Sequence, residues 1–322
     1  HTACTCVNKE ADVEMSAAVF RVKADLKSLE LSDSAAPLPD QGRYLDFYRI
    51  RPVHEHNFGS FVSGDLKLAG QFFHPSESTS AQGSLICVHG YLDHVGTTVN
   101  LNIQLLDEGY HVAVQDHPGH GLSEGRRASV RDFETYRVAF SDFFELASSR
   151  LPAPYHVVAH SMGSTVVIDY LNEKESSPFR RMVFLTPLMK DTKPRSLHTF
   201  AAVISPFIDH LGRIREENTT DLEYLEFSAK DPLQPGCVST RWSVAFNRWR
   251  KESEDFQPRS ERPLIVYGAS DIIVDNQASQ EWFDRVFPSH KSVVIEQANH
   301  QLHNEIEPIR ERVLSLIIRE LE

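Results

Sequence analysis

The stretch Tyr155–Asn172, with the sequence YHVVAHSMGSTVVIDYLN, indicates how this chain folds. An apolar run typical of a buried strand ends at Ala159, and a helical pattern begins at Ser164. The sharp turn between them carries Ser161 at its apex, where a serine hydroxyl projects above a sheet as an accessible nucleophile. The small residues Ala159 and Gly163 on either side of the turn let strand and helix approach closely. The usual sequence pattern around a nucleophilic serine on such a turn is G-x-S-x-G, from which Ala159 departs.

The same alternation of strand and helix recurs on both sides of this unit. Six apolar runs are predicted strands: Leu85–Val88, His111–Gln115, Tyr155–Ala159, Met182–Thr186, Leu264–Tyr267 and Ser292–Ile295. Helical spacing is found in Val99–Glu108, Val130–Ser149, Ser164–Asn172 and Glu307–Glu322. This order predicts an α/β fold, with a mostly parallel central sheet and helices on both faces.

One long interruption separates the strand that ends near Thr186 from the strand that begins at Pro263. It lacks a strand signal and contains helical patterns rich in aromatic residues. A structureless loop of about 75 residues is improbable in a compact domain, so we expect an inserted helical cap. Two ordinary crossover helices around an extra strand remain the alternative.

The first part of the chain is expected to lie at the periphery. A short helix is predicted within Val13–Leu31, followed by a linker at Asp33–Asp40, and alternating residues predict a β-hairpin over Gly59–His74. We therefore divide the chain into an N-terminal extension (1–57), a first core segment (58–186), a cap (187–258) and a second core segment (259–322).

Composition excludes several classes of protein. The 322 residues are 41% hydrophobic and 24% charged, which is ordinary for a globular protein. No run approaches the roughly 18 apolar residues of a transmembrane helix. The net charge of −12 repels phosphate backbones, so no nucleic-acid partner is expected. Because the sequence starts at His1, a signal peptide removed before this residue stays open as an alternative to a cytoplasmic location.

Metal and cofactor sites are not expected either. No CxxC pair occurs among the four cysteines, which are Cys4, Cys6, Cys87 and Cys237. Cys4 and Cys6 are too close in sequence for a favourable mutual disulfide, and Cys87 lies in an apolar run as a small buried residue. His117 and His120 have metal-like spacing, but without a carboxylate–histidine cluster beside them we interpret them as part of a structural turn.

A nucleophilic serine needs a base and a carboxylate that orients the base. Asp271 follows the predicted strand Leu264–Tyr267, and His300 follows the predicted strand Ser292–Ile295. With Ser161, both therefore lie on loops at the carboxyl ends of strands, where parallel sheets place their sites. The order serine, acid, histidine predicts a catalytic triad.

Each role has a rival nearby in the sequence. Asp275 lies four residues beyond Asp271, and His303 lies three residues beyond His300. Asp271 and His300 are preferred because each stands where the chain leaves the sheet. His160 adjoins the serine, but neighbouring side chains on such a turn diverge, so it is interpreted as a packing residue.

The tetrahedral oxyanion requires two backbone N–H donors. The residue after the nucleophile, Met162, supplies one. The loop after an earlier strand supplies the other, and Tyr91 in the stretch His89-Gly90-Tyr91 is our candidate. A plain turn after the strand is the alternative for this stretch.

Five motifs in order carry a resemblance to a known family. They are Val88–His94 (VHGYLDH), Asp116–Gly125 (DHPGHGLSEG), His160–Gly163 (HSMG), Gly268–Asp271 (GASD) and Asn299–Glu305 (NHQLHNE). The chain resembles the α/β-hydrolases, and within them the monoacylglycerol lipase and bacterial lysophospholipase branch, which includes members named serine aminopeptidases (S33). The resemblance covers about residues 58–322. It implies the triad argued above and a helical cap over an acyl-binding cleft.

The leading hypothesis is a serine hydrolase that cleaves carboxylic esters of fatty acids, of the monoacylglycerol or lysophospholipid type. An aminopeptidase or amidase with the same triad is the alternative. It would need an acidic group to hold a substrate amine, for which the cap offers Glu216, Glu217, Asp221, Glu223 and Glu226. A non-catalytic ligand-binding scaffold is a third alternative, which an intact triad disfavours.

Aromatic residues of the predicted cap suit a lipid chain. Phe207, Trp242 and Phe246 are the candidate substrate-binding residues, and simple packing of the cap on the core is the alternative for them. The expected partner is a small ester or lipid, with transient contact to a membrane surface. The oligomeric state and the acyl length stay open.

Overall fold

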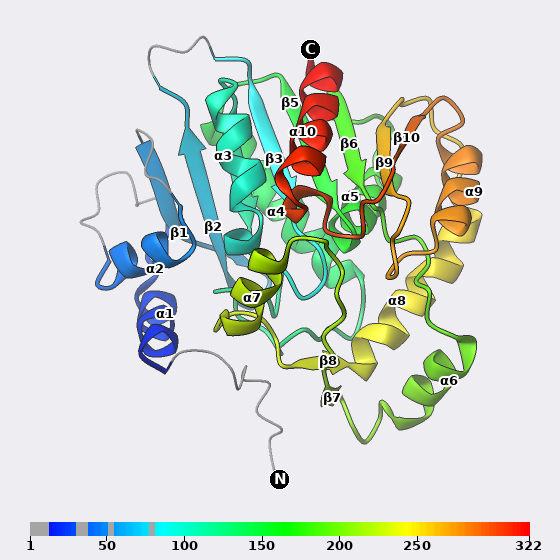
Figure 1. Cartoon of the computed structure of the whole chain (residues 1–322), viewed down its shortest axis with the longest axis horizontal. Coiled ribbons are helices and arrows are strands. Elements are labelled where there is room, and N and C mark those ends of the chain that lie inside the picture. The colour runs from blue at the N-terminus through cyan, green and yellow to red at the C-terminus, as the bar shows by residue number, and fades with distance from the viewer. Residues whose placement is uncertain (1–12, 30–37, 51–54, 77–80) are drawn as a thin grey trace.

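A computed structural model describes residues 13–29, 38–50, 55–76 and 81–322 of the chain. Over these ranges, the protein is built around an eight-stranded sheet flanked by helices (Figure 1). The strand order is β1-β2-β4-β3-β5-β6-β9-β10. β1 and β2 pair antiparallel, as do β2 and β4, whereas all later neighbours pair parallel. The predicted α/β class is confirmed.

The strands begin and end close to the predicted positions. Their bounds are β1 (Glu55–Ser63), β2 (Leu66–His74), β3 (Ser84–Val88), β4 (His111–Gln115), β5 (Tyr155–His160), β6 (Arg181–Leu185), β9 (Leu264–Gly268) and β10 (Lys291–Ile295). The predicted hairpin is β1–β2, in which Ser63 pairs with Leu66. Gly64 in its turn has φ +55, a conformation that glycine adopts without the strain a side chain would bring.

Alternate side chains of the strands feed two separate cores. Ile86 and Val88 of β3 belong to one core, together with residues of α4 (Glu134–Arg150), α5 (Met162–Asn172) and α9 (Asn276–Val286). Leu85 and Cys87 belong to the other, with residues of α1 (Val13–Asp25), α2 (Gln41–Phe47), α3 (Val99–Asp107) and α10 (Glu307–Leu321). Helices therefore cover both faces, and the central strands are apolar on both sides.

The N-terminal segment contributes to the second of these cores. The predicted helix within Val13–Leu31 is present as α1, and it ends at Asp25. The chain after it runs so close to β1 that a Cβ on Gly59 would lie 2.8 Å from the Cα of Leu29. Most of the predicted linker Asp33–Asp40 lies outside the described residues. The extension is therefore packed against the core through α1 and α2.

The segment 187–258, which we call the cap, lies beyond the carboxyl ends of the parallel strands (Figure 1). It contains α6 (Arg195–Ile204), α7 (Leu222–Lys230) and α8 (Thr240–Glu252). It also contains a two-stranded antiparallel sheet of β7 (His210–Gly212) and β8 (Cys237–Ser239). The expectation that this segment contains no strand is therefore wrong. Strands of three residues are too short to leave a periodic pattern in the sequence.

Two of the four cysteines lie among the described residues. Cys87 is a buried free thiol, as predicted, and burial raises its pKa to about 12. Cys237 is disulfide-bonded. Within the described part of the chain, no helix is long and apolar enough to cross a membrane.

Candidate active site

Ser161 occupies a strained turn between β5 and α5. Its φ of 51° and ψ of −119° are rare for a residue with a side chain, and such strain is typical of a nucleophile held at a strand-to-helix turn. A Cβ on Gly163 would lie 2.4 Å from the carbonyl oxygen of Val88, so only glycine lets α5 pass this close to β3. Ala159 is fully buried in β5, which shows that the methyl group that departs from the usual pattern is accommodated.

The structure brings Ser161, His300 and Asp271 together, although they are far apart in sequence. The Nε2 of His300 lies 3.0 Å from the Oγ of Ser161. Its Nδ1 lies 2.9 Å from the Oδ2 of Asp271. Ser161 is only 4% exposed, and His300 is equally buried, so these bonds form largely out of water.

The hydrogen bonds around Asp271 indicate how protons are placed in this chain of residues. Its Oδ1 accepts the backbone N–H groups of Ile273 and Val274, at 2.8 and 3.0 Å. Burial raises the pKa of Asp271, but His300 and the two amides outweigh burial and hold the pKa below its usual value. An ionised Asp271 accepts the Nδ1–H of His300, which leaves Nε2 free to accept a proton from Ser161.

The rival residues have other partners. Asp275 caps α9 by accepting the N–H of Ala278 at 3.0 Å, and it forms an ion pair with Lys190 at 2.7 Å. His303 is buried with its ring 4.7 Å from that of His160, and burial and the neighbouring histidine lower its pKa to about 3. Neither rival lies in the Ser161–His300 chain.

His160 does more than fill space. Its Nε2 lies 3.1 Å from the carbonyl oxygen of His300, and its Nδ1 lies 3.5 Å from Asp93. Gln301 also donates to Asp93, at 3.2 Å. Burial raises the pKa of Asp93, but His160 and the other nearby histidines outweigh burial and hold the pKa below its usual value, so the carboxylate is ionised. This support of the His300 loop was not predicted from the sequence, although Asp93 stands inside the motif Val88–His94.

The candidate oxyanion donors lie on either side of Ser161. Met162 is the first residue of α5, where backbone N–H groups have no acceptor within the helix. A Cβ on Gly90 would lie 3.2 Å from the Cβ of Ser161, so the loop that carries Tyr91 passes directly over the serine. The Tyr91 hydroxyl donates to the carbonyl of Ala128 at 2.8 Å, which anchors the loop.

The three candidate substrate-binding residues lie in different places. Trp242 of α8 stacks on Tyr91 with ring centroids 3.8 Å apart, and Phe246 stacks on Trp242 at 5.3 Å. These two are buried beside the loop over the serine. Phe207, in contrast, is 89% exposed on the outer surface of the cap. The helical spacing of aromatic residues did not reveal which of them face outward.

The histidines with metal-like spacing belong to a buried cluster. Burial lowers the pKa of His117 to about 4 and that of His120 to about 3, so both are neutral at pH 7. His117 Nε2 lies 3.0 Å from the carbonyl oxygen of His89, and His120 Nδ1 lies 3.0 Å from that of Pro118. The described residues contain no group of three or more His, Cys, Asp or Glu able to hold a metal ion.

Comparison with known proteins places this geometry in a family. The chain is 27% identical to human monoglyceride lipase over 254 residues, which cover 73% of this chain and 81% of that enzyme. It is 26% identical to the phospholipase YtpA of Bacillus subtilis over 241 residues, which cover 71% of this chain and 91% of YtpA.

Among solved structures, a soluble variant of monoglyceride lipase from Saccharomyces cerevisiae, in complex with a substrate analog, matches with a TM-score of 0.73 and 18% identity. The match covers 85% of this chain and 98% of that one, and it shows the same fold. The family model described as Serine aminopeptidase, S33, matches residues 79–307, a range that contains Ser161, Asp271 and His300. The chain therefore belongs to the serine aminopeptidase S33 family, within the α/β-hydrolase fold.

Proposed function

We propose that this protein is a serine hydrolase that cleaves carboxylic esters of fatty acids, of the monoacylglycerol or lysophospholipid type. The observation that carries the proposal is the continuous chain of hydrogen bonds from Ser161 through His300 to Asp271. The names of the relatives, which include monoglyceride lipase and phospholipase, support an ester of a fatty acid as substrate.

The first half of the reaction forms an acyl-enzyme. The Oγ of Ser161 attacks the ester carbonyl carbon while its proton passes to the Nε2 of His300. Asp271 stabilises the imidazolium that results. The backbone N–H groups of Met162 and Tyr91 bind the negative oxygen of the tetrahedral intermediate. When the intermediate collapses, His300 gives the proton to the departing alcohol.

The second half returns the enzyme to its starting state. A water molecule enters beside His300 and attacks the acyl carbonyl carbon. The Nε2 of His300 removes a proton from this water as the attack occurs. The same two amides bind the second oxyanion. The Ser161 oxygen leaves and takes the proton back from His300, and the fatty acid is released.

The acidic residues of the cap do not favour an amine substrate. Glu216 pairs with Lys193, and Glu226 pairs with Lys230 one helical turn away. Asp221 accepts the N–H of Tyr224 as the N-terminal cap of α7. The remaining two, Glu217 and Glu223, are exposed to solvent. We therefore place ester cleavage ahead of aminopeptidase activity.

A substrate panel tests the proposal. It contains p-nitrophenyl esters from acetate to laurate, a monoacylglycerol, a lysophospholipid and an aminoacyl anilide. We expect hydrolysis of the esters, with a preference for fatty-acyl chains, and no cleavage of the anilide. Faster cleavage of the anilide than of every ester would show that the protein is an aminopeptidase.

We expect Trp242→Ala to weaken the preference for longer acyl chains. Burial contributes about 0.8 kcal/mol per CH₂. Each added pair of methylenes should therefore raise kcat/KM of the wild type by up to about tenfold until the cleft is full. If Trp242 and Phe246 line that cleft, the increase per pair should shrink in the variant, while acetate cleavage changes less. The measurement is kcat/KM against chain length for soluble p-nitrophenyl esters.

A melting curve separates this role from simple packing. If Trp242 only holds the cap on the core, the variant loses thermal stability but keeps the wild-type dependence on chain length. Phe207→Ala is the matched control, because it removes an aromatic ring of the same cap that is exposed to solvent. Its chain-length dependence on soluble esters should equal that of the wild type.

We also propose that the outer surface of the cap contacts lipid. Leu197, Phe200 and Val203 lie at helical spacing on α6 and are exposed, and Phe207 and Ile208 follow directly. Exposed apolar groups at this density mark an interaction surface, and a lipid aggregate is where the proposed substrate resides. The apolar side chains of this surface would insert into the lipid and so place the cap over the substrate.

Vesicle binding tests this surface. The double variant Phe200→Ser and Phe207→Ser should lose association with phosphatidylcholine vesicles, and should cleave monoacylglycerol in vesicles about tenfold more slowly. Its kcat/KM on p-nitrophenyl butyrate should be unchanged. Phe20→Ser is the control, because Phe20 of α1 and Phe200 are both 53% exposed. Equal vesicle binding by the double variant and the wild type would exclude this surface.

A further inference from the structure

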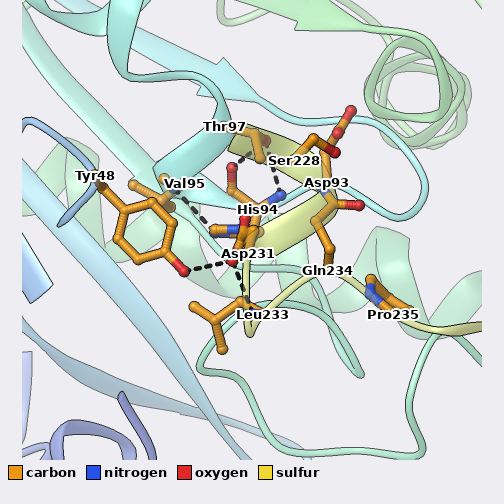
Figure 2. Close-up of polar contacts among 12 residues, drawn as sticks. Tyr48, Asp93, His94, Val95, Thr97, Ser228, Asp231, Leu233, Gln234 and Pro235 are labelled. Atoms are coloured by element: carbon orange, nitrogen blue, oxygen red, sulfur yellow. Dashed lines mark hydrogen bonds and ion pairs between the residues drawn. The ribbon is translucent and has the colours of Figure 1, made fainter. Parts of the chain in front are cut away.

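A buried carboxylate, Asp231, lies where the cap meets the loop over the serine and helix α2 (Figure 2). Its Oδ1 accepts the Tyr48 hydroxyl at 2.6 Å and the Leu233 N–H at 2.8 Å. Its Oδ2 lies 2.7 Å from the Nε2 of His94. A carboxylate out of water is tolerated only when such donors replace hydration. Asp231 is therefore held by three separate parts of the chain.

The bond between His94 and Asp231 has a defined direction. The Gly96 N–H donates to the Nδ1 of His94 at 3.1 Å, so Nδ1 carries no proton. The ring proton is then on Nε2, which donates it to Asp231. Both ring nitrogens are thus engaged, and the ring cannot turn without breaking one of the two bonds.

His94 ends the loop that carries the proposed oxyanion donor Tyr91. At the start of this loop, the Tyr91 hydroxyl accepts the N–H of Ser239 at 3.1 Å, and the Tyr91 ring stacks on Trp242. At the end of the loop, His94 is held by its hydrogen bond to Asp231. Val95, the next residue, donates its N–H to Asp116 at 2.7 Å. Residues 231–242 of the cap therefore hold both ends of this loop.

The third donor comes from outside the segment that the family model matches. Tyr48 follows α2, whereas the match begins at residue 79. Its ring is buried and packs edge-on against that of His94, with centroids 5.1 Å apart. The hydroxyl therefore fixes Asp231 while the ring supports His94. Figure 2 shows Tyr48 and His94 reaching Asp231 from different sides.

We propose that Asp231, oriented by Tyr48, is a positioning residue that holds His94 and thereby aims the Tyr91 N–H at the substrate oxyanion. This role rests on the proposed function. It makes the N-terminal extension, through Tyr48, part of the machinery that sets transition-state binding. Loosening this contact should raise the energy of the oxyanion more than that of the bound ester, and so lower kcat rather than raise KM.

The test compares Tyr48→Phe and Asp231→Asn with the control Tyr44→Phe. Tyr44 lies on α2 and is equally buried, but its hydroxyl accepts a hydrogen bond from Gln71 at 3.2 Å instead of binding Asp231. Loss of a complete oxyanion donor costs about 10²- to 10³-fold in kcat. A displaced donor costs less, so we expect about a threefold loss for Tyr48→Phe and about 10- to 100-fold for Asp231→Asn. KM for p-nitrophenyl butyrate should stay within about twofold.

A trifluoromethyl ketone distinguishes positioning from mere stability. Its adduct with Ser161 carries an oxyanion, so its Ki should rise by the same factor as kcat/KM falls. Tyr44→Phe should lower the melting temperature but leave kcat and Ki unchanged. An unchanged Ki in Tyr48→Phe, or equal effects of Tyr48→Phe and Tyr44→Phe, would overturn the positioning role.

A failure of the proposed function would look different from a failure of the positioning role. If the proposed function is wrong, the wild type itself would neither cleave the esters nor bind the ketone. If Asp231→Asn does not fold, the comparison of Tyr48→Phe with Tyr44→Phe decides the question alone. Wild-type values of kcat and Ki in a folded Asp231→Asn would also overturn the positioning role.

Discussion

Replacement of Ser161 by alanine is expected to lower kcat for ester hydrolysis by about 10⁴-fold or more. The variant lacks the oxygen that attacks the carbonyl, and His300 then has no proton to accept from the enzyme. The fold should persist, because alanine removes one atom from a buried side chain and leaves the backbone conformation of the turn unchanged. The measurement is p-nitrophenyl butyrate hydrolysis beside a thermal melt followed by circular dichroism.

A covalent probe makes this result specific to the residue. A fluorophosphonate should label wild-type protein on the peptide that contains Ser161 and should fail to label the variant. Ser164 is a suitable control, since it is also buried and donates its hydroxyl to the carbonyl of Ala159. Ser164→Ala should keep both activity and labelling. Retention of more than a tenth of wild-type kcat by Ser161→Ala would show that another group is the nucleophile.

Asp271→Asn should lose about 10⁴-fold in kcat. The backbone N–H groups of Ile273 and Val274 require an oxygen at the Oδ1 position, so the amide NH₂ of the asparagine must face the Nδ1 of His300. Two N–H donors cannot face each other there. The proton of His300 therefore moves to Nε2, which can then no longer accept a proton from Ser161.

The same substitution at Asp275 is the matched control. An asparagine there still accepts the N–H of Ala278 and keeps the cap of α9. It loses the ion pair with Lys190, which is partly exposed to solvent and so contributes little. We expect kcat of Asp275→Asn within about twofold of the wild type. The reverse ranking of the two variants in kcat would assign the triad acid to Asp275.

Local patterns were enough to predict much of this molecule from the sequence. Runs of apolar residues marked the strands, helical spacing marked α3, α4, α5 and α10, and the turn at Ser161 predicted its place between β5 and α5. Such features depend on residues that are near each other in the chain. The positions of Asp271 and His300 followed because parallel strands bring their carboxyl ends to one edge of the sheet.

Other features depend on which surfaces meet after folding. Trp242 and Phe207 are both aromatic residues of the cap, yet one stacks on Tyr91 and the other is exposed, because only packing decides which side of a short element faces the core. The strands β7 and β8 were not predicted for a similar reason. Each has only three residues, and each is stabilised by pairing with the other strand and not by a periodic pattern of its own.

The contact between Tyr48 and Asp231 is the clearest case. The two residues are 183 positions apart, and neither stands in a motif that marks it. A hydrogen bond between buried side chains exists only where the fold brings donor and acceptor to within about 3 Å, and sequence separation says nothing of that distance. The sequence by itself determined the fold class and the candidates for the triad, whereas the tertiary structure alone decided which cap residues hold the loop over Ser161.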